Sequence, residues 1–287
     1  MTSSIENKPM KFAFSSNAFR KYSLVETIEI LAEIGYDGIE IMADIPHAYP
    51  PDLKENDIFA IKSALDRNNM KISNLNTFML WAEGDTWHPS WIEKNPALRE
   101  KRVQHTRRCI ELAAELGART ISTEPGGPLD GLSEAEGLEI FKTGLETVQN
   151  LAREKEVRIL IEPEPDLLIE NSRQFLSFYA ELDKDVFGLN FDIGHFFCVN
   201  EDPAALVSKL QHCSHHYHLE DIAKSRVHHH LLPGSGEIDL FQVLTEIKQT
   251  GYRDFVTVEL YPYEDQPVET AEKALSYLKK LFPRNNN

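Results

Sequence analysis

Eight strand-like segments recur along the chain, at intervals wide enough to hold a helix between each pair. No other feature restricts the fold so strongly, because strands that alternate with helices pair in parallel within one sheet. Each segment has five or six residues, the length of a strand rather than of a helix. The eight segments are Lys11–Ser15, Gly38–Met42, Lys71–Asn76, Arg119–Glu124, Arg158–Glu162, Gly188–Asp192, Ser214–Leu219 and Phe255–Leu260.

Helical periodicity fills the stretches between these segments. Leu24, Ile28 and Leu31 repeat at helical spacing, and the pattern stops at Gly35, a residue type that commonly ends helices. Eight strand–helix units without a second domain predict an α/β protein that forms a single (β/α)8 TIM barrel. A doubly wound open sheet is the alternative, but no Gly-x-Gly-x-x-Gly motif follows the first strand.

The domain layout and composition are simple. The chain has 287 residues, of which 41% are hydrophobic and 26% charged. We expect an N-terminal extension at residues 1–10, the barrel at 11–282 and a disordered tail at 283–287. No signal-peptide pattern opens the chain, and no apolar run reaches the ~20 residues of a membrane span. Three widely spaced cysteines are typical of a reducing compartment, so we predict a cytoplasmic protein without membrane contact.

The charge balance restricts the partners. Lys and Arg number 30 against 46 Asp and Glu, which gives a net charge of −16. Such a field repels phosphate backbones and anionic membranes. We therefore expect a small-molecule partner rather than a nucleic acid.

Carboxylates lie on one face of several predicted strands. Strand side chains alternate between faces, so Ile39 and Ile41 share one face and Glu40 takes the other. The same alternation sets a carboxylate opposite the apolar face at Glu162, Asp192 and Glu259. The apolar face suits the surrounding helices, so the carboxylates point into the barrel near the ends of the strands.

Buried carboxylates need a partner, since an unpaired buried charge is costly. Two Glu, one Asp and His218, on the seventh strand, converge at the end where barrel enzymes keep their active sites. Oxygen and nitrogen ligands of this kind suit Mn²⁺, Mg²⁺, Co²⁺ or Zn²⁺. The alternative is that each carboxylate is a core residue held in a salt bridge.

Histidines are concentrated late in the chain, with eight of the eleven between His195 and His230. His216 shares the face of His218 but lies deeper, which favours a packing role. His228 and His229 belong to a run of three histidines that looks like a metal-binding tract, although a solvated loop explains them equally well. His230 and His195 are the candidates for a second metal.

At these residues the sequence resembles the xylose isomerase-like barrel superfamily. This group of sugar phosphate isomerases and epimerases includes tagatose 3-epimerase-type enzymes, hydroxypyruvate isomerase, inosose dehydratase and, more distantly, endonuclease IV. The resemblance implies that Glu162, Asp192, His218 and Glu259 ligate one divalent metal. The motifs that carry it are Gly35–Glu40, Ile161–Pro163, Phe191–His195, His218–Asp221, Pro233–Asp239 and Val258–Glu259.

The predicted chemistry is metal-dependent isomerisation or epimerisation of a ketose, or of a related polyol or hydroxy-carbonyl compound, through a metal-stabilised enediolate. The acid/base pair is Glu162 and Glu259, which the resemblance also implies. We expect His195, Arg226 and Glu164 to contact the substrate. Dehydration shares the first proton transfer and stays open.

Two other functions compete with this one. The first is an endonuclease IV-like phosphodiesterase, which would need two or three metals. Glu124 stands where that branch has a histidine and His228 where it has an aspartate, and both differences disfavour this function. The second is a non-catalytic metal-binding barrel.

Two loops carry further expectations. The Gly234–Gly236 turn lies where barrels often hold phosphate, but we interpret it as a turn before a helix capped by Asp239. Trp81, Trp87 and Trp91 lie in the loop after the third strand. They either cover a sugar or contact a second subunit, and we expect a homodimer or a homotetramer.

Overall fold

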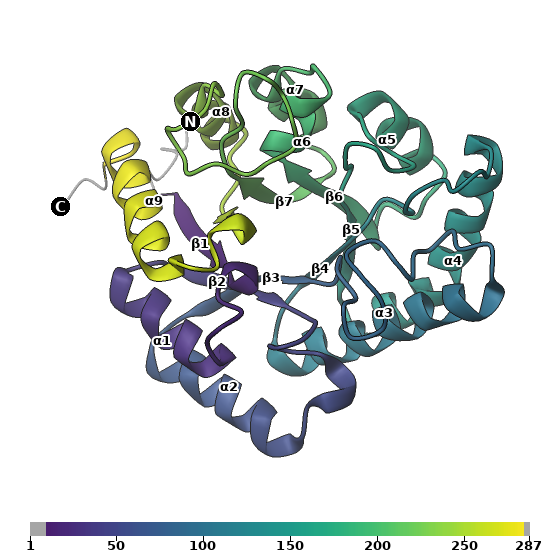
Figure 1. Ribbon diagram of the computed structural model, residues 1–287, viewed down its shortest axis with the longest axis horizontal. Helices are drawn as coiled ribbons and strands as arrows, with labels where there is room; N and C mark the ends of the chain where they lie inside the picture. Colours follow the sequence, from purple (N-terminus) through teal and green to yellow (C-terminus); the bar gives the residue numbers. More distant parts are fainter. Residues whose placement is uncertain (1–9, 284–287) are drawn as a thin grey trace, which may run out of the picture.

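The computed structural model describes residues 10–283, and within them eight parallel strands close into a barrel in sequence order (Figure 1). This confirms the predicted (β/α)8 fold. The predicted extension and tail lie outside the described residues, apart from Met10 and Pro283. The strands are β1 (Lys11–Ser15), β2 (Gly38–Met42), β3 (Lys71–Asn76), β4 (Thr120–Thr123), β5 (Arg158–Ile161), β6 (Phe187–Asp192), β7 (Ser214–Leu219) and β8 (Phe255–Val258).

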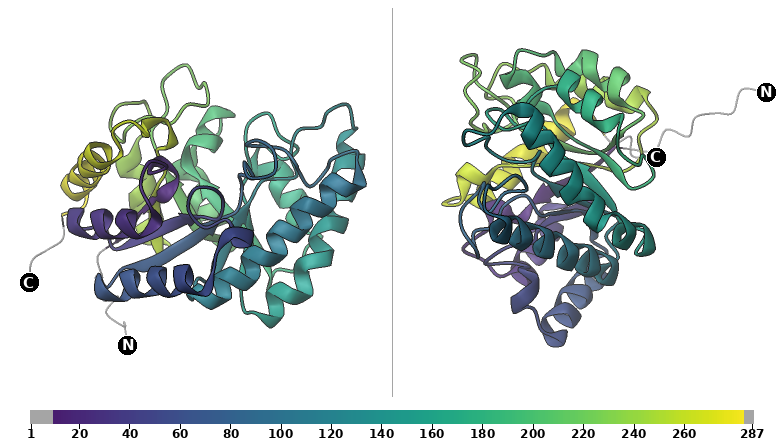
Figure 2. Two further views of the ribbon diagram at one scale, coloured as in Figure 1. Left: turned by 60° about the horizontal axis from the view of Figure 1, so that its bottom comes forward. Right: turned by 90° about the vertical axis from the view of Figure 1, so that its right-hand side faces the viewer.

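Helices surround the barrel, and the last helix packs beside the first where the ring closes (Figures 1 and 2). None of the described helices is long and apolar enough to span a membrane. Short 3-10 turns lie at η1 (Ser16–Ala18), η2 (Pro50–Asp52) and η3 (Tyr261–Tyr263). The α-helices are α1 (Leu24–Ile34), α2 (Glu55–Arg67), α3 (Pro96–Leu116), α4 (Glu134–Glu154), α5 (Ser172–Tyr179), α6 (Ile193–Cys198), α7 (Pro203–Leu210), α8 (Leu240–Gln249) and α9 (Pro267–Leu281).

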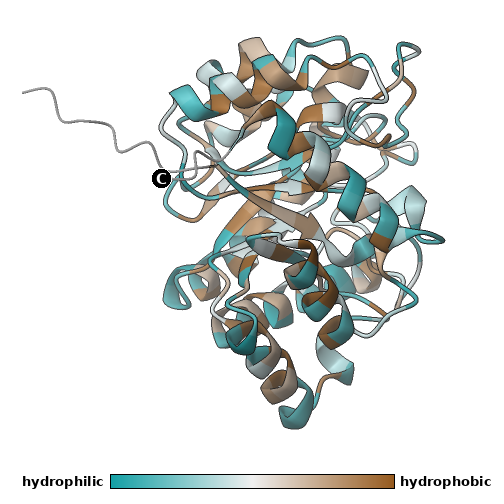
Figure 3. Ribbon diagram, turned by 90° about the vertical axis from the view of Figure 1, so that its left-hand side faces the viewer, coloured by the Kyte–Doolittle hydropathy of each residue, from teal (hydrophilic) through white to brown (hydrophobic). Residues whose placement is uncertain are grey.

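Local signals set the helix ends. Ser23 and Glu26 form a reciprocal capping box at the start of α1. Gly35 and Gly117 end α1 and α3 with φ angles of 98° and 79°, which glycine adopts at little cost. Figure 3 shows that the helices carry both hydrophobic and hydrophilic stretches, as amphipathic helices around a barrel must.

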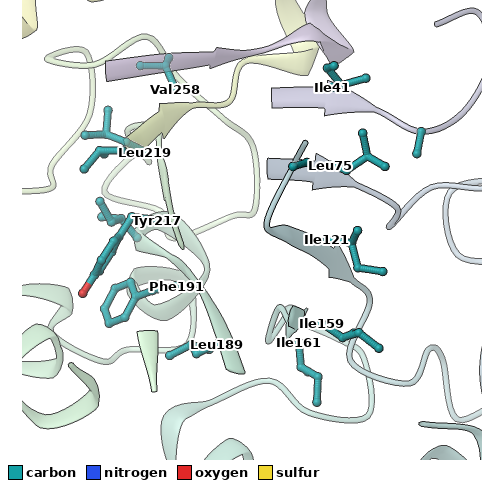
Figure 4. Close-up of a cluster of buried hydrophobic side chains, with 14 of the residues drawn as sticks. Ile41, Leu75, Ile121, Ile159, Ile161, Leu189, Phe191, Tyr217, Leu219 and Val258 are labelled. Carbon is teal, nitrogen blue, oxygen red and sulfur yellow. The ribbon is translucent and has the colours of Figure 1, made fainter. Parts of the chain in front are cut away.

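The main core lies between the strands and the helices. Ile41, Ile159 and Phe191 are fully buried, and Figure 4 shows such strand side chains directed outward from the ring of strands. The opposite face of the same strands carries Glu40 and Asp192, which are also fully buried. The predicted alternation is therefore confirmed, and it leaves the carboxylates inside the barrel.

Three strands end earlier than predicted. Glu124, Glu162 and Glu259 follow β4, β5 and β8 rather than lying within them. The backbone N–H of Glu162 still bonds the carbonyl of Thr123, and that of Glu259 bonds the carbonyl of Leu219. The chain leaves the regular ladder at these residues, which directs their side chains toward the mouth of the barrel, the end where the strands terminate.

The tryptophans of the β3–α3 loop lie in different surroundings. Trp91 is 1% exposed, packs against Phe141 and donates its indole N–H to Thr123 Oγ1, so the expectation that it covers a sugar is wrong. Its large apolar ring is more stable in the core than over a polar mouth. Trp87 is 44% exposed and contacts Glu164 at the mouth.

Candidate metal centre

The four predicted ligands come together at the mouth of the barrel. Glu162, Asp192, His218 and Glu259 each offer one ligand atom, and these atoms all lie within 4.8 Å of one another. The Nδ1 atom of His218 lies 2.8 Å from Glu162, 3.6 Å from Asp192 and 3.5 Å from Glu259. Four neighbouring strands, β5 to β8, supply one residue each.

Glu40 determines which nitrogen of His218 faces the cluster. The Nε2 atom of His218 lies 2.8 Å from Glu40 Oε2 and donates its proton there, so Nδ1 is the atom that faces the three other ligands. A register shift between β2 and β3 sets Glu40 opposite Asn74, whose amide also donates to its carboxylate. Glu40 was expected inside the barrel but had no predicted role.

Amide side chains orient the two predicted acid/base residues. Asn17 and Asn76 both donate to Glu259 Oε1, at 2.9 and 3.2 Å. Asn190 donates to Glu162 Oε2 at 2.8 Å, which leaves Oε1 to face His218. Each carboxylate therefore has one oxygen held by amides and another directed at the cluster.

His216 lies deeper in the barrel, as predicted. Its Nδ1 bonds Asn190 Oδ1 at 2.7 Å and its Nε2 bonds Thr257 Oγ1 at 2.8 Å. Burial lowers the pKa of His216 to about 3, so the ring is neutral. It supports Asn190, which in turn holds Glu162.

Three further histidines converge beside this cluster. The Nε2 atom of His228 lies 3.0 Å from His195 Nε2 and 3.1 Å from His230 Nε2. The Nδ1 atoms of His195 and His230 donate to the backbone carbonyls of Pro163 and Glu259, so their Nε2 atoms face the common point. His228 therefore packs in a cluster of histidines and not in a solvated loop, whereas His229 is exposed.

The surroundings of these three rings affect a positive charge differently. Burial lowers the pKa of His228 to about 2 and that of His230 to about 4, so both rings are neutral. Burial acts in the same direction on His195, but the charges of Asp192 and Glu164 outweigh it and raise the pKa of His195 to about 9. Two of the three imidazoles are therefore in the neutral form that binds metals.

The mouth carries an excess of buried negative charge. Burial raises the pKa of Glu259 to about 8; His218 opposes this, and the charges of Glu162 and Glu40 reinforce it. Burial likewise raises the pKa of Glu164 to about 7 against the charge of His195. In the described part of the chain, the ion pairs of these carboxylates are formed with histidines. This donor set fits a divalent cation.

The predicted substrate contacts lie in different surroundings. Glu164 is 3.5 Å from both His195 Nε2 and His228 Nδ1, at the mouth. Arg226 stacks on the ring of Phe197 at 3.8 Å and donates to the carbonyl of the same residue. The structure therefore does not bring Arg226 into the cluster, and its contact with a substrate stays a prediction.

The glycine-rich turn after β7 encloses a side chain of the protein itself. The backbone N–H groups of Gly234, Gly236 and Ile238 donate to the carboxylate of Asp221. Asp239 caps α8, as expected. These amides are already satisfied, so the turn has no free nest for a phosphate.

Comparison with known proteins agrees with this fold. Residues 28–281 match the family described as xylose isomerase-like TIM barrel. Fructoselysine 3-epimerase of Shigella flexneri is 26% identical, over 88% of this chain and 91% of the relative. Inosose dehydratase of Lacticaseibacillus casei is 23% identical, with 90% of each chain covered. The solved structure of an IolI protein with a bound zinc atom superposes with a TM-score of 0.78 at 20% identity, over 95% of this chain and 98% of that one.

Proposed function

The chain belongs to the xylose isomerase-like TIM barrel family, and from that premise we propose that it is a divalent-metal-dependent isomerase or epimerase. Its substrate is a ketose, or a related polyol or hydroxy-carbonyl compound. The observation that carries the proposal is the convergence of Glu162, Asp192, His218 and Glu259 on one point, with the Nδ1 atom of His218 directed at it. The similarity to an epimerase and to a zinc-containing neighbour supports it.

A divalent ion at these ligands would polarise the carbonyl of a ketose and so acidify the neighbouring C–H bond. Glu162 and Glu259 would move the proton, because each has one oxygen held by amides and one directed at the cluster. Both side chains are almost fully buried, at 2% and 6% exposure, so water has little access to the proton. Return of the proton to the same carbon from the opposite face inverts that carbon, and return to the carbonyl carbon isomerises the sugar.

The mouth favours an uncharged or cationic substrate. Glu164 and Glu259 present carboxylates there, the glycine-rich turn is satisfied by Asp221, and Arg226 is turned toward Phe197. An anionic group such as a phosphate would meet these carboxylates, and neither Arg226 nor the glycine-rich turn is directed at the mouth to hold it. Glu164 would hold a substrate oxygen, and so would His195 where no second ion is bound.

A second ion fits beside the first. His195 and His230 were its predicted ligands, and His228 adds a third nitrogen that faces the same point. Three imidazole nitrogens form a set that Zn²⁺, Co²⁺ or Ni²⁺ binds well. This ion would lie next to Asp192, whose Oδ2 is 3.7 Å from His195 Nε2.

Dehydration is the second candidate reaction, because the inosose dehydratase relative covers the same length of chain. It needs the same proton abstraction, followed by loss of a β-hydroxyl group. Product analysis after the substrate screen separates it from epimerisation. A phosphodiesterase activity is disfavoured by the net charge of −16.

The first experiment is metal analysis by mass spectrometry on the purified wild type and on His218→Ala. We expect tightly held divalent metal that falls sharply in the variant. Loaded protein is then screened with neutral, aminated and phosphorylated ketoses in D₂O, where proton NMR detects exchange at the carbon next to the carbonyl. Absence of metal in the wild type after soaking with Mn²⁺ and Zn²⁺ would overturn the proposal.

The variant Glu259→Gln separates catalysis from metal binding. The amide keeps the shape and one oxygen ligand but cannot take up a proton, so deuterium exchange should fall by at least about 100-fold, the usual contribution of a general base. Metal affinity should fall much less. Full exchange activity in this variant would remove Glu259 from the mechanism.

A further inference from the structure

Glu220 is a buried carboxylate that the proposed function does not use. It follows β7 directly and is 0% exposed. Its Oε1 atom accepts the backbone N–H of Gly194 at the start of α6. Within residues 10–283 its Oε2 atom has no hydrogen-bond partner. A fully buried carboxylate oxygen without a partner is costly, so the surroundings of Oε2 need an explanation.

Two other ligand atoms lie next to Glu220. Asp192, Glu220 and His230 each offer one atom, and these atoms lie within 4.8 Å of one another. Among the described residues Asp192 Oδ2 is also without a hydrogen-bond partner, since the N–H of His195 bonds the other oxygen of Asp192. One carboxylate oxygen of each residue therefore lies near a nitrogen of His230.

This arrangement requires a cation or a shared proton. Two ionised carboxylates side by side in a buried site repel each other strongly. The charged groups that face them are Glu259 and the rings of His195, His218 and His230. A divalent ion between the oxygens and the histidine nitrogens would satisfy both carboxylates at once.

The local sequence makes room for Glu220 at this point. A Cβ atom at residue 194 would lie 2.0 Å from Glu220 Oε1, closer than any real contact. Gly194 therefore lets the carboxylate approach the start of α6, where Asp192 and His195 are also held. The fit between Gly194 and Glu220 holds Oε1 at the start of α6, and within residues 10–283 it leaves Oε2 as the oxygen without a hydrogen-bond partner.

We propose that Glu220, together with Asp192, supplies oxygen ligands to the second ion, which His195, His228 and His230 hold through nitrogen. Asp192 would thereby link the two ions, since it also belongs to the first set. The inference rests on the second ion of the proposed function. It does not depend on which sugar is the substrate.

The test is titration of the metal-free full chain with Co²⁺, followed by calorimetry and visible absorption. The wild type should bind two ions, and Glu220→Gln should bind the second at least about 10-fold more weakly, with a changed Co²⁺ spectrum. Glu237→Gln is the matched control, because it removes an exposed carboxylate from the same loop and should leave both ions in place.

The choice of glutamine separates the ligand role from a shared proton. A glutamine amide can donate to Asp192 as a protonated Glu220 would, so retention of both ions at wild-type affinity would overturn the proposal. Gly194→Ala keeps the carboxylate but displaces it, and should weaken the second ion in the same way. Circular dichroism confirms that each variant is folded.

The outcomes for the wild type distinguish the underlying claims. Binding of no ion would overturn both the proposed function and this inference. Binding of a single ion would overturn the second site, and Glu220 with it, while leaving the proposed function intact.

Discussion

The chemistry of the mouth depends on which ring nitrogen each histidine leaves free. Glu40 accepts a hydrogen bond from Nε2–H of His218. The backbone carbonyls of Pro163 and Glu259 accept hydrogen bonds from Nδ1–H of His195 and His230. The three acceptor oxygens would not bind a metal themselves. They nevertheless determine which nitrogen of each ring faces the metal-binding cluster.

The variant Glu40→Gln tests this at the residue scale. The amide removes the charge that holds the Nε2 proton, so the affinity of the first ion should fall roughly 10- to 100-fold while the fold is kept. Competition with a fluorescent chelator measures the affinity. Glu55→Gln, an exposed glutamate at the start of α2, is the control. Equal affinities in the two variants would show that Glu40 does not orient the ligand.

At the scale of single elements, short signals decide where helices start and stop. Capping boxes at Ser23 and Ser133 begin α1 and α4, and glycines with positive φ end α1 and α3. These signals fix the lengths of the helices and so the point where each following strand begins. The ends of the strands are set differently, because residues such as Glu162 leave the ladder to enter the site.

Gly117 offers a clean test of a helix end. An added Cβ atom would meet nothing within 4 Å, so a substitution there reports on the backbone alone, with φ at +79°. Gly117→Ala should lower the free energy of unfolding by about 1 kcal/mol, and Gly117→Asn by less, because asparagine tolerates the left-handed conformation better. Urea unfolding at fixed metal concentration measures both. An alanine variant as stable as the wild type would contradict this explanation.

At the scale of the whole molecule, the barrel brings together residues that are far apart in the sequence. His47, in the β2–α2 loop, bonds Ser16 and the carbonyls of Phe19 and Tyr22 in the β1–α1 region. It is 7% exposed and joins two loops at the mouth. Burial lowers the pKa of His47 from 6.5 to about 4, so the folded protein holds this ring neutral.

Stability should therefore fall with acid in a way that depends on His47. Below pH 6.5 the unfolded chain binds a proton that the folded chain refuses until about pH 4, so the free energy of unfolding drops across that window. The shift corresponds to roughly 3 kcal/mol at most. His47→Gln should be less stable at pH 7.5, and its deficit should shrink toward pH 4. A deficit that does not change with pH would contradict the assignment.

Much of the fold and part of the site could be predicted from the sequence. The alternation of Ile39, Glu40 and Ile41 indicates an outer and an inner face of β2, and the structure has both. The same rule indicates Glu162, Asp192 and Glu259, and His218 of the seventh strand completes the set. The four converge because parallel strands of a barrel end at one mouth.

The positions of the loop side chains became known only from the tertiary structure. His228 meets His195 across 33 positions in the sequence, Arg226 turns to Phe197, and Trp91 enters the core. Glu220 reaches Gly194 only because β6 and β7 are neighbours. Strand and helix patterns depend on residues that are close together in the sequence, so the sequence by itself determined the barrel and the inner face of its strands. The path of a loop depends on packing against distant residues, so only the folded molecule decided which loop side chains complete the site.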